Sequence, residues 1–144
     1  MRDLFNNVAL RRGMSPVAAG TDNTAYVSQI IDMQGWRSLL WAILIGTNTD
    51  ADATFTVLVE EGDAANLSDA AAVDDKDLLG TEAGASFTFT HDDSVRKIGY
   101  KGRKRYCRLT ITPAGNNSGN IFIASAAILG HPAAAPEDTT DQTH

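Results

Sequence analysis

Short segments of β-strand character, each closed by turn-forming residues, are the feature that most constrains the fold of this chain. Residues 37–45 are almost wholly apolar and end at a Gly-Thr-Asn-Thr-Asp turn, which is typical of a central strand covered on both faces. Residues 54–60 and 105–112 alternate between two kinds of side chain, as half-buried strands do. No convincing long helix is present. We therefore expect an all-β fold: a single antiparallel β-sandwich, jelly-roll-like, or a small barrel of about seven or eight strands.

The two ends of the chain differ from its middle. Arg11, Gly13 and Pro16 interrupt any long periodic pattern near the start, so residues 1–20 are expected to form a flexible arm with at most one short strand. Residues 131–144 hold almost no large apolar side chain, which predicts a flexible or partner-ordered tail. The sandwich domain is then expected to occupy residues 21–130.

Composition and charge narrow the classes of function. The net charge of −6 argues against a dedicated nucleic-acid binder. The longest apolar run, residues 39–45, is far shorter than the ~20 residues of a membrane helix. Cys107 is the only cysteine, so no internal disulfide is expected, and the N-terminus lacks the apolar core of a secretory signal. These features indicate synthesis in a reducing cytoplasm and no membrane partner.

Catalytic signatures are missing from the sequence. It holds no glycine-rich phosphate loop, no Gly-x-Ser-x-Gly elbow and no His-Glu-x-x-His motif. Cys107 alternates with Leu109 and Ile111, which predicts an inert core thiol and not a nucleophile. We therefore expect no enzymatic activity, no catalytic residue and no cofactor.

The middle of the chain is strongly acidic. Residues 50–82 include ten carboxylates and a single base, Lys76. Such oxygen-rich loops can bind calcium, which takes about six to eight oxygen ligands. Because neither the EF-hand spacing nor the glycine-aspartate nonapeptide of β-rolls occurs, we favour a solvated acidic surface without a metal and leave calcium as the alternative.

Basic residues are concentrated later in the chain. Seven of the twelve lysines and arginines lie in residues 96–108, where Tyr100 and Tyr106 are interleaved. The candidate contact residues in this segment are Arg96, Lys101, Arg103, Lys104 and Arg105. An acidic protein partner is the favoured interpretation, while a plain charged surface and a nucleic-acid surface stay open. An acidic middle and a basic later segment would also suit head-to-tail contacts between copies or with a repeating lattice.

A series of short motifs carries a family resemblance. Segment 97–109 contains Ile98-Gly-Tyr100 and Lys104-Arg-Tyr106, and Gly130-His-Pro132 follows. Three motifs precede them: Asp32-Met-Gln-Gly35, Val57-Leu-Val-Glu-Glu61 and Asp77-Leu-Leu-Gly80. Through these motifs and their order, residues 25–136 resemble small virion proteins encoded in the head-gene cluster of tailed bacteriophages, namely head-decoration, cement or minor capsid proteins.

The resemblance implies a structural role on a capsid. Proteins of this family bind the outer face of the assembled shell and cement neighbouring capsomers, so the expected partner is the major capsid protein and the expected location is the virion surface. No catalytic or cofactor residue carries over. The acidic stretch 63–77 and the pair Arg103-Lys104 depart from the family pattern, which leaves the contact surface open.

Apolar residues near the N-terminus are the second group of candidate contacts. Ordering an arm costs about 1–2 kcal/mol per residue, so an arm that binds a shell needs apolar anchors, and Leu4, Phe5, Val8 and Leu10 supply them. A homotrimer at three-fold positions of the shell is the expected assembly. Two alternatives stay open: a tail-associated or receptor-binding β-sandwich of the virion, and a small β-barrel that binds single-stranded nucleic acid.

Overall fold

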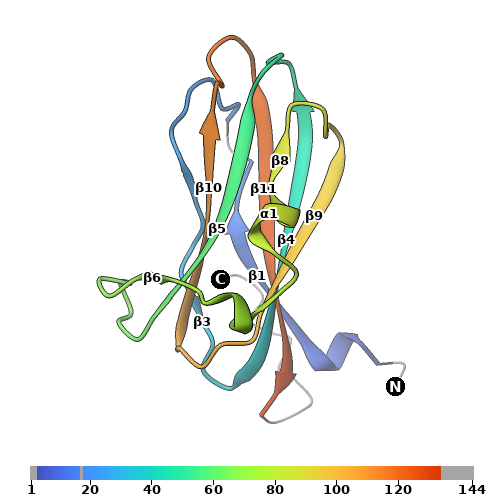
Figure 1. Ribbon diagram of the computed structural model, residues 1–144. Coiled ribbons are helices and arrows are strands. Elements are labelled where there is room, and N and C mark those ends of the chain that lie inside the picture. Colours follow the sequence, from blue (N-terminus) through green and yellow to red (C-terminus); the bar gives the residue numbers. More distant parts are fainter. Residues whose placement is uncertain (1–2, 17, 134–144) are drawn as a thin grey trace.

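The computed structural model describes residues 3–16 and 18–133, and it is a sandwich of two antiparallel β-sheets (Figure 1). The predicted all-β fold is confirmed. Helical structure in the described residues is limited to three single turns, η1 (Phe5–Asn7), η2 (Asp75–Asp77) and α1 (Glu82–Ala85). None of the described helices has the length and apolar character needed to span a membrane.

The first sheet, sheet A, has five strands in the order β1-β11-β4-β9-β7. Their bounds are β1 Val8–Met14, β11 Ile121–Pro132, β4 Trp36–Asn48, β9 Ser94–Tyr100 and β7 Leu78–Leu79. The two longest strands, β4 and β11, lie side by side in the middle, and residues 39–45 of β4 are paired on both sides.

The second sheet, sheet B, is built on β10 (Tyr106–Ala114) and β5 (Thr54–Gly62), which pair over nine residues each. Four two-residue strands complete it: β2 Tyr26–Val27, β3 Ile31–Asp32, β6 Ala71–Ala72 and β8 Phe87–Thr88. β2 and β3 pair with β10, whereas β6 and β8 pair with β5. The total of eleven strands exceeds the predicted seven or eight because of such two-residue pairings.

The core lies between the two sheets and follows the alternation of the sequence. Trp41 of sheet A and Leu109 of sheet B are fully buried. Phe55 and Phe87 stack with their ring centroids 4.7 Å apart. Cys107 is also fully buried, as the alternation around it predicts. In the long segment over residues 61–84, the side chains of Leu67, Val73 and Leu78 are buried and attach this segment to the sandwich.

Residues 8–14 form the edge strand β1 and are the one short strand that the prediction allowed within residues 1–20. This strand pairs with β11 from Val8 to Met14, so the sandwich begins before residue 21. Gly13 lies at an irregularity of the register between Arg12 and Met14, and a Cβ there would lie 2.2 Å from the Ser125 Oγ, so this close approach to β11 favours a glycine. At the other end, His131 and Pro132 belong to β11, and residues 134–144 of the predicted tail lie outside the described residues.

One face of β4 is not covered, contrary to the prediction for residues 37–45. Trp41 and Ile43 are fully buried against sheet B, but the alternate residues of β4 point away from sheet B. Leu40 and Ala42 are only partly buried, and Leu44 is 49% exposed. The described residues provide no second layer over this face, although its side chains are apolar.

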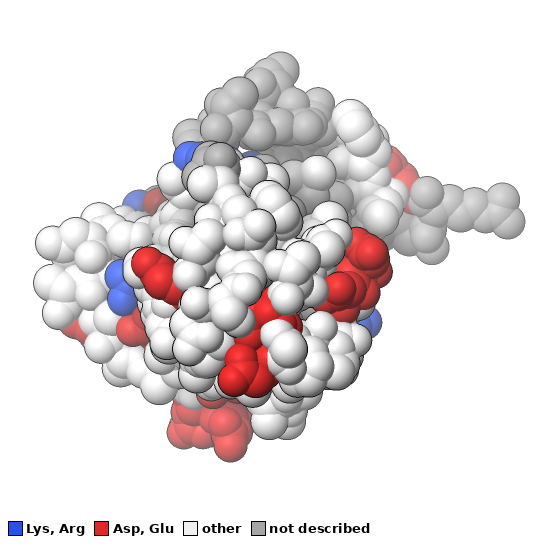
Figure 2. All heavy atoms as spheres, turned by 90° about the horizontal axis from the view of Figure 1, so that it is seen from above, with Lys and Arg blue, Asp and Glu red and all other residues white. Residues whose placement is uncertain are grey.

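The loops gather at the two ends of the sandwich, and the upper end of Figure 1 is acidic. Loops 49–53 and 115–120 are joined by hydrogen bonds from the backbone N–H groups of Asn117 and Ser118 to Asp50 (3.0 and 2.9 Å). We define the acidic end by Asp22, Asp50, Asp52, Asp92 and Asp93. Figure 2, which looks onto this end, shows several carboxylates and few basic side chains.

The opposite end is basic. The turn after β3 and the loop between β9 and β10 lie side by side there, since the Met33 N–H donates to the Arg105 carbonyl (2.7 Å). We define the basic end by Arg37, Lys101, Arg103, Lys104 and Arg105. Asp32, Glu61, Asp63 and Asp69 lie among these basic residues, so the predicted polarity of charge is only partly present in the fold.

Candidate interaction surface

The outward face of sheet A is a continuous apolar surface. One row crosses all five strands through Leu10, Ile128, Leu40, Gly99 and Leu79, which are neighbours in the registers of the sheet. A parallel row holds Ala124, Leu44 and Val95. We call the outward residues of β1, β11, β4, β9 and β7 the outer face; Phe122 and Val8 complete its apolar members.

Several large side chains of the outer face are well exposed. Val95 is 67%, Leu79 55% and Leu10 47% exposed, and Phe122 is 42% exposed. Leu4, the N-cap residue of η1, is 71% exposed, and Phe5, the first residue of η1, is 66% exposed. Single exposed apolar residues are ordinary on a protein surface, but a contiguous set on one sheet marks an interaction surface.

The N-terminal residues predicted as apolar anchors are therefore part of this surface, but their position in the fold differs from the prediction. Val8 and Leu10 lie on the outer face as parts of a fixed strand and not on a flexible arm. Leu4 and Val8 share a hollow of about 390 Å³ with Gly130 and Pro132 of β11. Binding through these residues requires little further ordering of the backbone.

Charge on the outer face has a single sign. Arg12 and Lys97 lie in one row, separated by Ala126 and Ala42, and no aspartate or glutamate occupies an outward position on its strands. A complementary partner would be mainly apolar and would carry carboxylates opposite these two cations.

A hollow of about 500 Å³ lies within the outer face. Leu40, Leu79 and Ile128 line it, and Gly99 and Gly130 leave it open. A Cβ at Gly99 would lie 2.9 Å from the Leu79 Cβ, so a side chain at this position would displace β7. The hollow is of a size that accepts an apolar side chain from a partner.

A second hollow, of about 520 Å³, lies at the basic end. Its apolar lining comes from Met33 and Trp36, and its basic lining is the set that defines this end: Arg37, Lys101, Arg103, Lys104 and Arg105. Four of the five basic residues that sequence analysis singled out are thus brought together here. The fifth, Arg96, lies on β9, where its Nη1 is 3.4 Å from the Gly84 carbonyl oxygen of α1.

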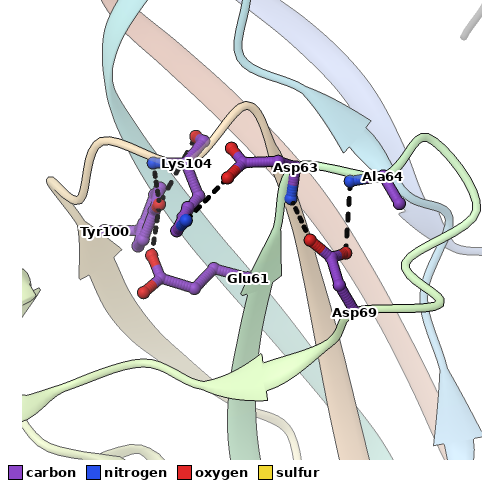
Figure 3. A network of polar contacts seen from close by, with 6 residues as sticks. All are labelled: Glu61, Asp63, Ala64, Asp69, Tyr100 and Lys104. Atoms are coloured by element: carbon purple, nitrogen blue, oxygen red, sulfur yellow. Dashed lines mark hydrogen bonds and ion pairs between the residues drawn. The ribbon is translucent and has the colours of Figure 1, made fainter.

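A polar network fixes the loop that forms this second hollow (Figure 3). The Tyr100 hydroxyl donates to Glu61 (2.6 Å) and accepts from the Lys104 N–H (3.2 Å). Burial, followed by the hydrogen bond to Glu61, raises the pKa of Tyr100, so the phenol keeps its proton. Asp69 accepts from the N–H groups of Asp63 and Ala64, which fixes the adjoining chain after β5.

Internal ion pairs neutralise part of the basic end. The Lys104 ammonium lies 2.6 Å from Asp63, and Arg105 binds both oxygens of Asp32 at 3.0 Å. Within residues 3–16 and 18–133, no ion pair involves Arg103. The charge open to a partner is therefore smaller than the sequence predicts.

The acidic side chains mostly accept hydrogen bonds from their own loops. Asp50, Asp69 and Asp74 each accept from nearby backbone N–H groups. In the part of the chain that the structure describes, no three histidine, cysteine, aspartate or glutamate side chains converge in a metal-binding arrangement. The calcium alternative gains no support from these residues.

Cys107 is expected to be unreactive in the folded protein. Burial raises the pKa of its thiol to about 12, so only about one molecule in ten thousand carries a thiolate at about pH 8. A chromogenic disulfide reagent should therefore titrate no thiol in the native chain and one thiol per chain after unfolding. Rapid reaction of the native protein would contradict the placement of Cys107 in the core.

Neither family models nor curated proteins match this chain in the comparisons made. The resemblance to phage head proteins therefore remains an expectation. The sequence analysis missed most of the outer face, including Leu40, Leu44 and Ile128, because only the sheet order brings these strands together. The sequence did contain a signal for this face, since apolar residues occupy both the inward and the outward positions of β4.

Proposed function

We propose that this chain is a structural, non-catalytic protein that decorates the outer surface of a tailed-phage capsid and binds the major capsid protein through the outer face of sheet A. The observation that supports docking is the uncovered apolar face with its two cations, Arg12 and Lys97. The resemblance of residues 25–136 to phage head proteins suggests the partner.

The size of the outer face fits a contact that is repeated many times. Four strands spaced about 4.8 Å apart, with outward residues over a length of about 27 Å, give an area of about 500 Å². A stable pairwise interface buries about 800 Å² on each partner. Burying this area on the chain alone yields about 12 kcal/mol, against an association cost of about 4–15 kcal/mol. One copy would bind modestly, and many copies on a lattice would stabilise the shell together.

The two alternatives have less support. Trp41, one of the two tryptophans that a sugar-binding surface might use, is fully buried. A nucleic-acid surface is weakened because Lys104 and Arg105 already pair with carboxylates. A tail-associated role would use the same outer face, so binding to isolated tails is included in the test.

Cosedimentation tests the proposed function. The purified full chain is mixed with capsids of the virus that encodes it, assembled without it, and in parallel with isolated tails and with single-stranded DNA. Saturable binding to capsids, at a fixed ratio to the major capsid protein, is the expected result. Binding only to tails or only to DNA, or no binding to capsids, would contradict the proposal.

A further inference from the structure

The two ends of the sandwich have complementary shape and charge. The basic end has a hollow with an apolar lining, Met33 and Trp36, and a basic rim. The acidic end presents the loop between β8 and β9, residues 89–93, in which Phe89 is 37% exposed and Asp92 and Asp93 are exposed. An apolar side chain beside two carboxylates is the chemistry that such a hollow accepts.

From this match we propose that copies of the chain associate head to tail, with loop 89–93 of one copy seated in the basic hollow of the next. Phe89 lies against the apolar lining formed by Met33 and Trp36, and the two aspartates face the basic rim. The occupant is thus a second copy of this chain. The inference does not depend on the proposed capsid docking, which uses a different surface.

Both halves of the contact are held in place before association. In the loop, the Phe89 N–H donates to the Ala53 carbonyl (2.9 Å), and the Asn48 N–H donates to Asp92 (3.1 Å). In the hollow, the Tyr100 hydroxyl anchors the Lys104 backbone (Figure 3). Association therefore orders little additional backbone, which lowers its entropic cost.

Charge at the two ends favours this contact over other pairings. Loops 49–53, 89–93 and 115–120 contain no lysine or arginine, so two acidic ends repel each other. At the basic end, Asp32 and Asp63 neutralise Arg105 and Lys104, and the cations that remain on the rim are Arg37, Lys101 and Arg103. A contact between unlike ends of one molecule is heterologous, so it generates a closed ring or an open filament according to the rotation between neighbours.

Sedimentation of the full chain over a range of concentrations tests the inference. At low salt, the average mass is expected to rise above the monomer mass of 15.3 kDa as the concentration increases towards about 1 mM. In about 1 M salt, where the Debye length is about 3 Å, it should return to the monomer value. A native protein that stays monomeric throughout the low-salt range would overturn the inference.

Two variants separate the halves of the contact. The hollow variant carries Arg37→Gln, Lys101→Gln and Arg103→Gln, and the loop variant carries Asp92→Asn and Asp93→Asn. Asparagine suits both loop positions, because it keeps an oxygen for the Asn48 N–H and tolerates the positive φ of 51° at residue 93. Each variant alone is expected to remain monomeric where the native chain associates.

An equimolar mixture of the two variants gives the sharpest result. The hollow variant keeps a native loop and the loop variant keeps a native hollow, so exactly one kind of contact remains and the mixture should form dimers and nothing larger. A Leu44→Lys control, altered on the outer face, should associate like the native chain. A mixture without dimers, or association that Leu44→Lys abolishes and the end variants leave intact, would contradict head-to-tail contact.

Discussion

Replacing Asp50 by alanine is expected to lower the free energy of unfolding by about 3 kcal/mol, the largest effect of any single loop substitution considered for this fold. The Asp50 side chain is 2% exposed and accepts hydrogen bonds from the N–H groups of Asp52 (3.0 Å), Asn117 (3.0 Å) and Ser118 (2.9 Å). Alanine leaves these donors without a partner and releases loop 115–120 from loop 49–53. Urea unfolding followed by tryptophan fluorescence measures the change.

The pH dependence of the same site supplies the control. Hydrogen bonds from the backbone of Asp52, and then from Ser118, hold the pKa of Asp50 well below its usual range. A lowered pKa contributes stability that is present above the unfolded value of about 3.9 and is lost as the pH falls towards the folded value. The stability gap between native protein and Asp50→Asn should therefore be largest near neutral pH and shrink as the pH falls below about 4.

An exposed carboxylate provides the matched comparison. Asp75→Asn, in η2, is expected to change the free energy of unfolding by less than about 0.5 kcal/mol. If Asp50→Ala cost no more than this control, or if the gap for Asp50→Asn did not vary with pH, Asp50 would not be the residue that joins the two loops.

Replacing Leu44 by lysine should weaken binding to capsids at least tenfold, which corresponds to about 1.4 kcal/mol. Leu44 lies within the outer face between Ala124 and Val95, so the substitution removes apolar area and places a third cation in a contact suited to carboxylates. Leu10→Lys, on β1, should have a similar effect. Cosedimentation with capsids at several protein concentrations measures the change.

Val27→Lys is the matched control for these variants. Val27 is 53% exposed, close to the 49% of Leu44, but it lies on β2 of sheet B. Val27→Lys should bind capsids like the native chain. The free energies of unfolding of all three variants should lie within about 1 kcal/mol of the native value, because the replaced side chains are already half solvated. Equal loss of binding for Val27→Lys and Leu44→Lys would contradict the proposal that the outer face binds the capsid.

The parts of the fold that were predicted correctly are those with strong local patterns. β5 and β10 follow from the alternation of residues 54–60 and 105–112, whose buried positions in the structure are the apolar ones. Two-residue strands such as β6 and β7 carry no such pattern, because their pairing depends on neighbours that other parts of the chain bring to them. The position of β1 within residues 1–20 was not predicted, because Arg11 and Gly13 interrupt the pattern of an edge strand that pairs on one side only.

Long-range partners explain why the site was only partly predicted. The sequence places Arg105 and Lys104 in a basic cluster, but their partners Asp32 and Asp63 lie 73 and 41 residues away, so neutralisation cannot be seen locally. The apolar character of residues 37–45 was recognised, but it was attributed to burial of both faces of the strand. An apolar run indicates two covered faces, and here the described chain supplies a cover for one face only.

The central claim is that the outer face of sheet A is the surface that a partner covers, and side-chain footprinting on decorated capsids tests it most directly. Hydroxyl radicals label exposed leucine, valine and phenylalanine in the free chain and in the chain bound to particles. Leu10, Leu44, Val95 and Phe122 are expected to become protected on binding, while Val27 keeps its labelling. Protection of Val27, with the four outer-face residues labelled as in the free chain, would contradict it.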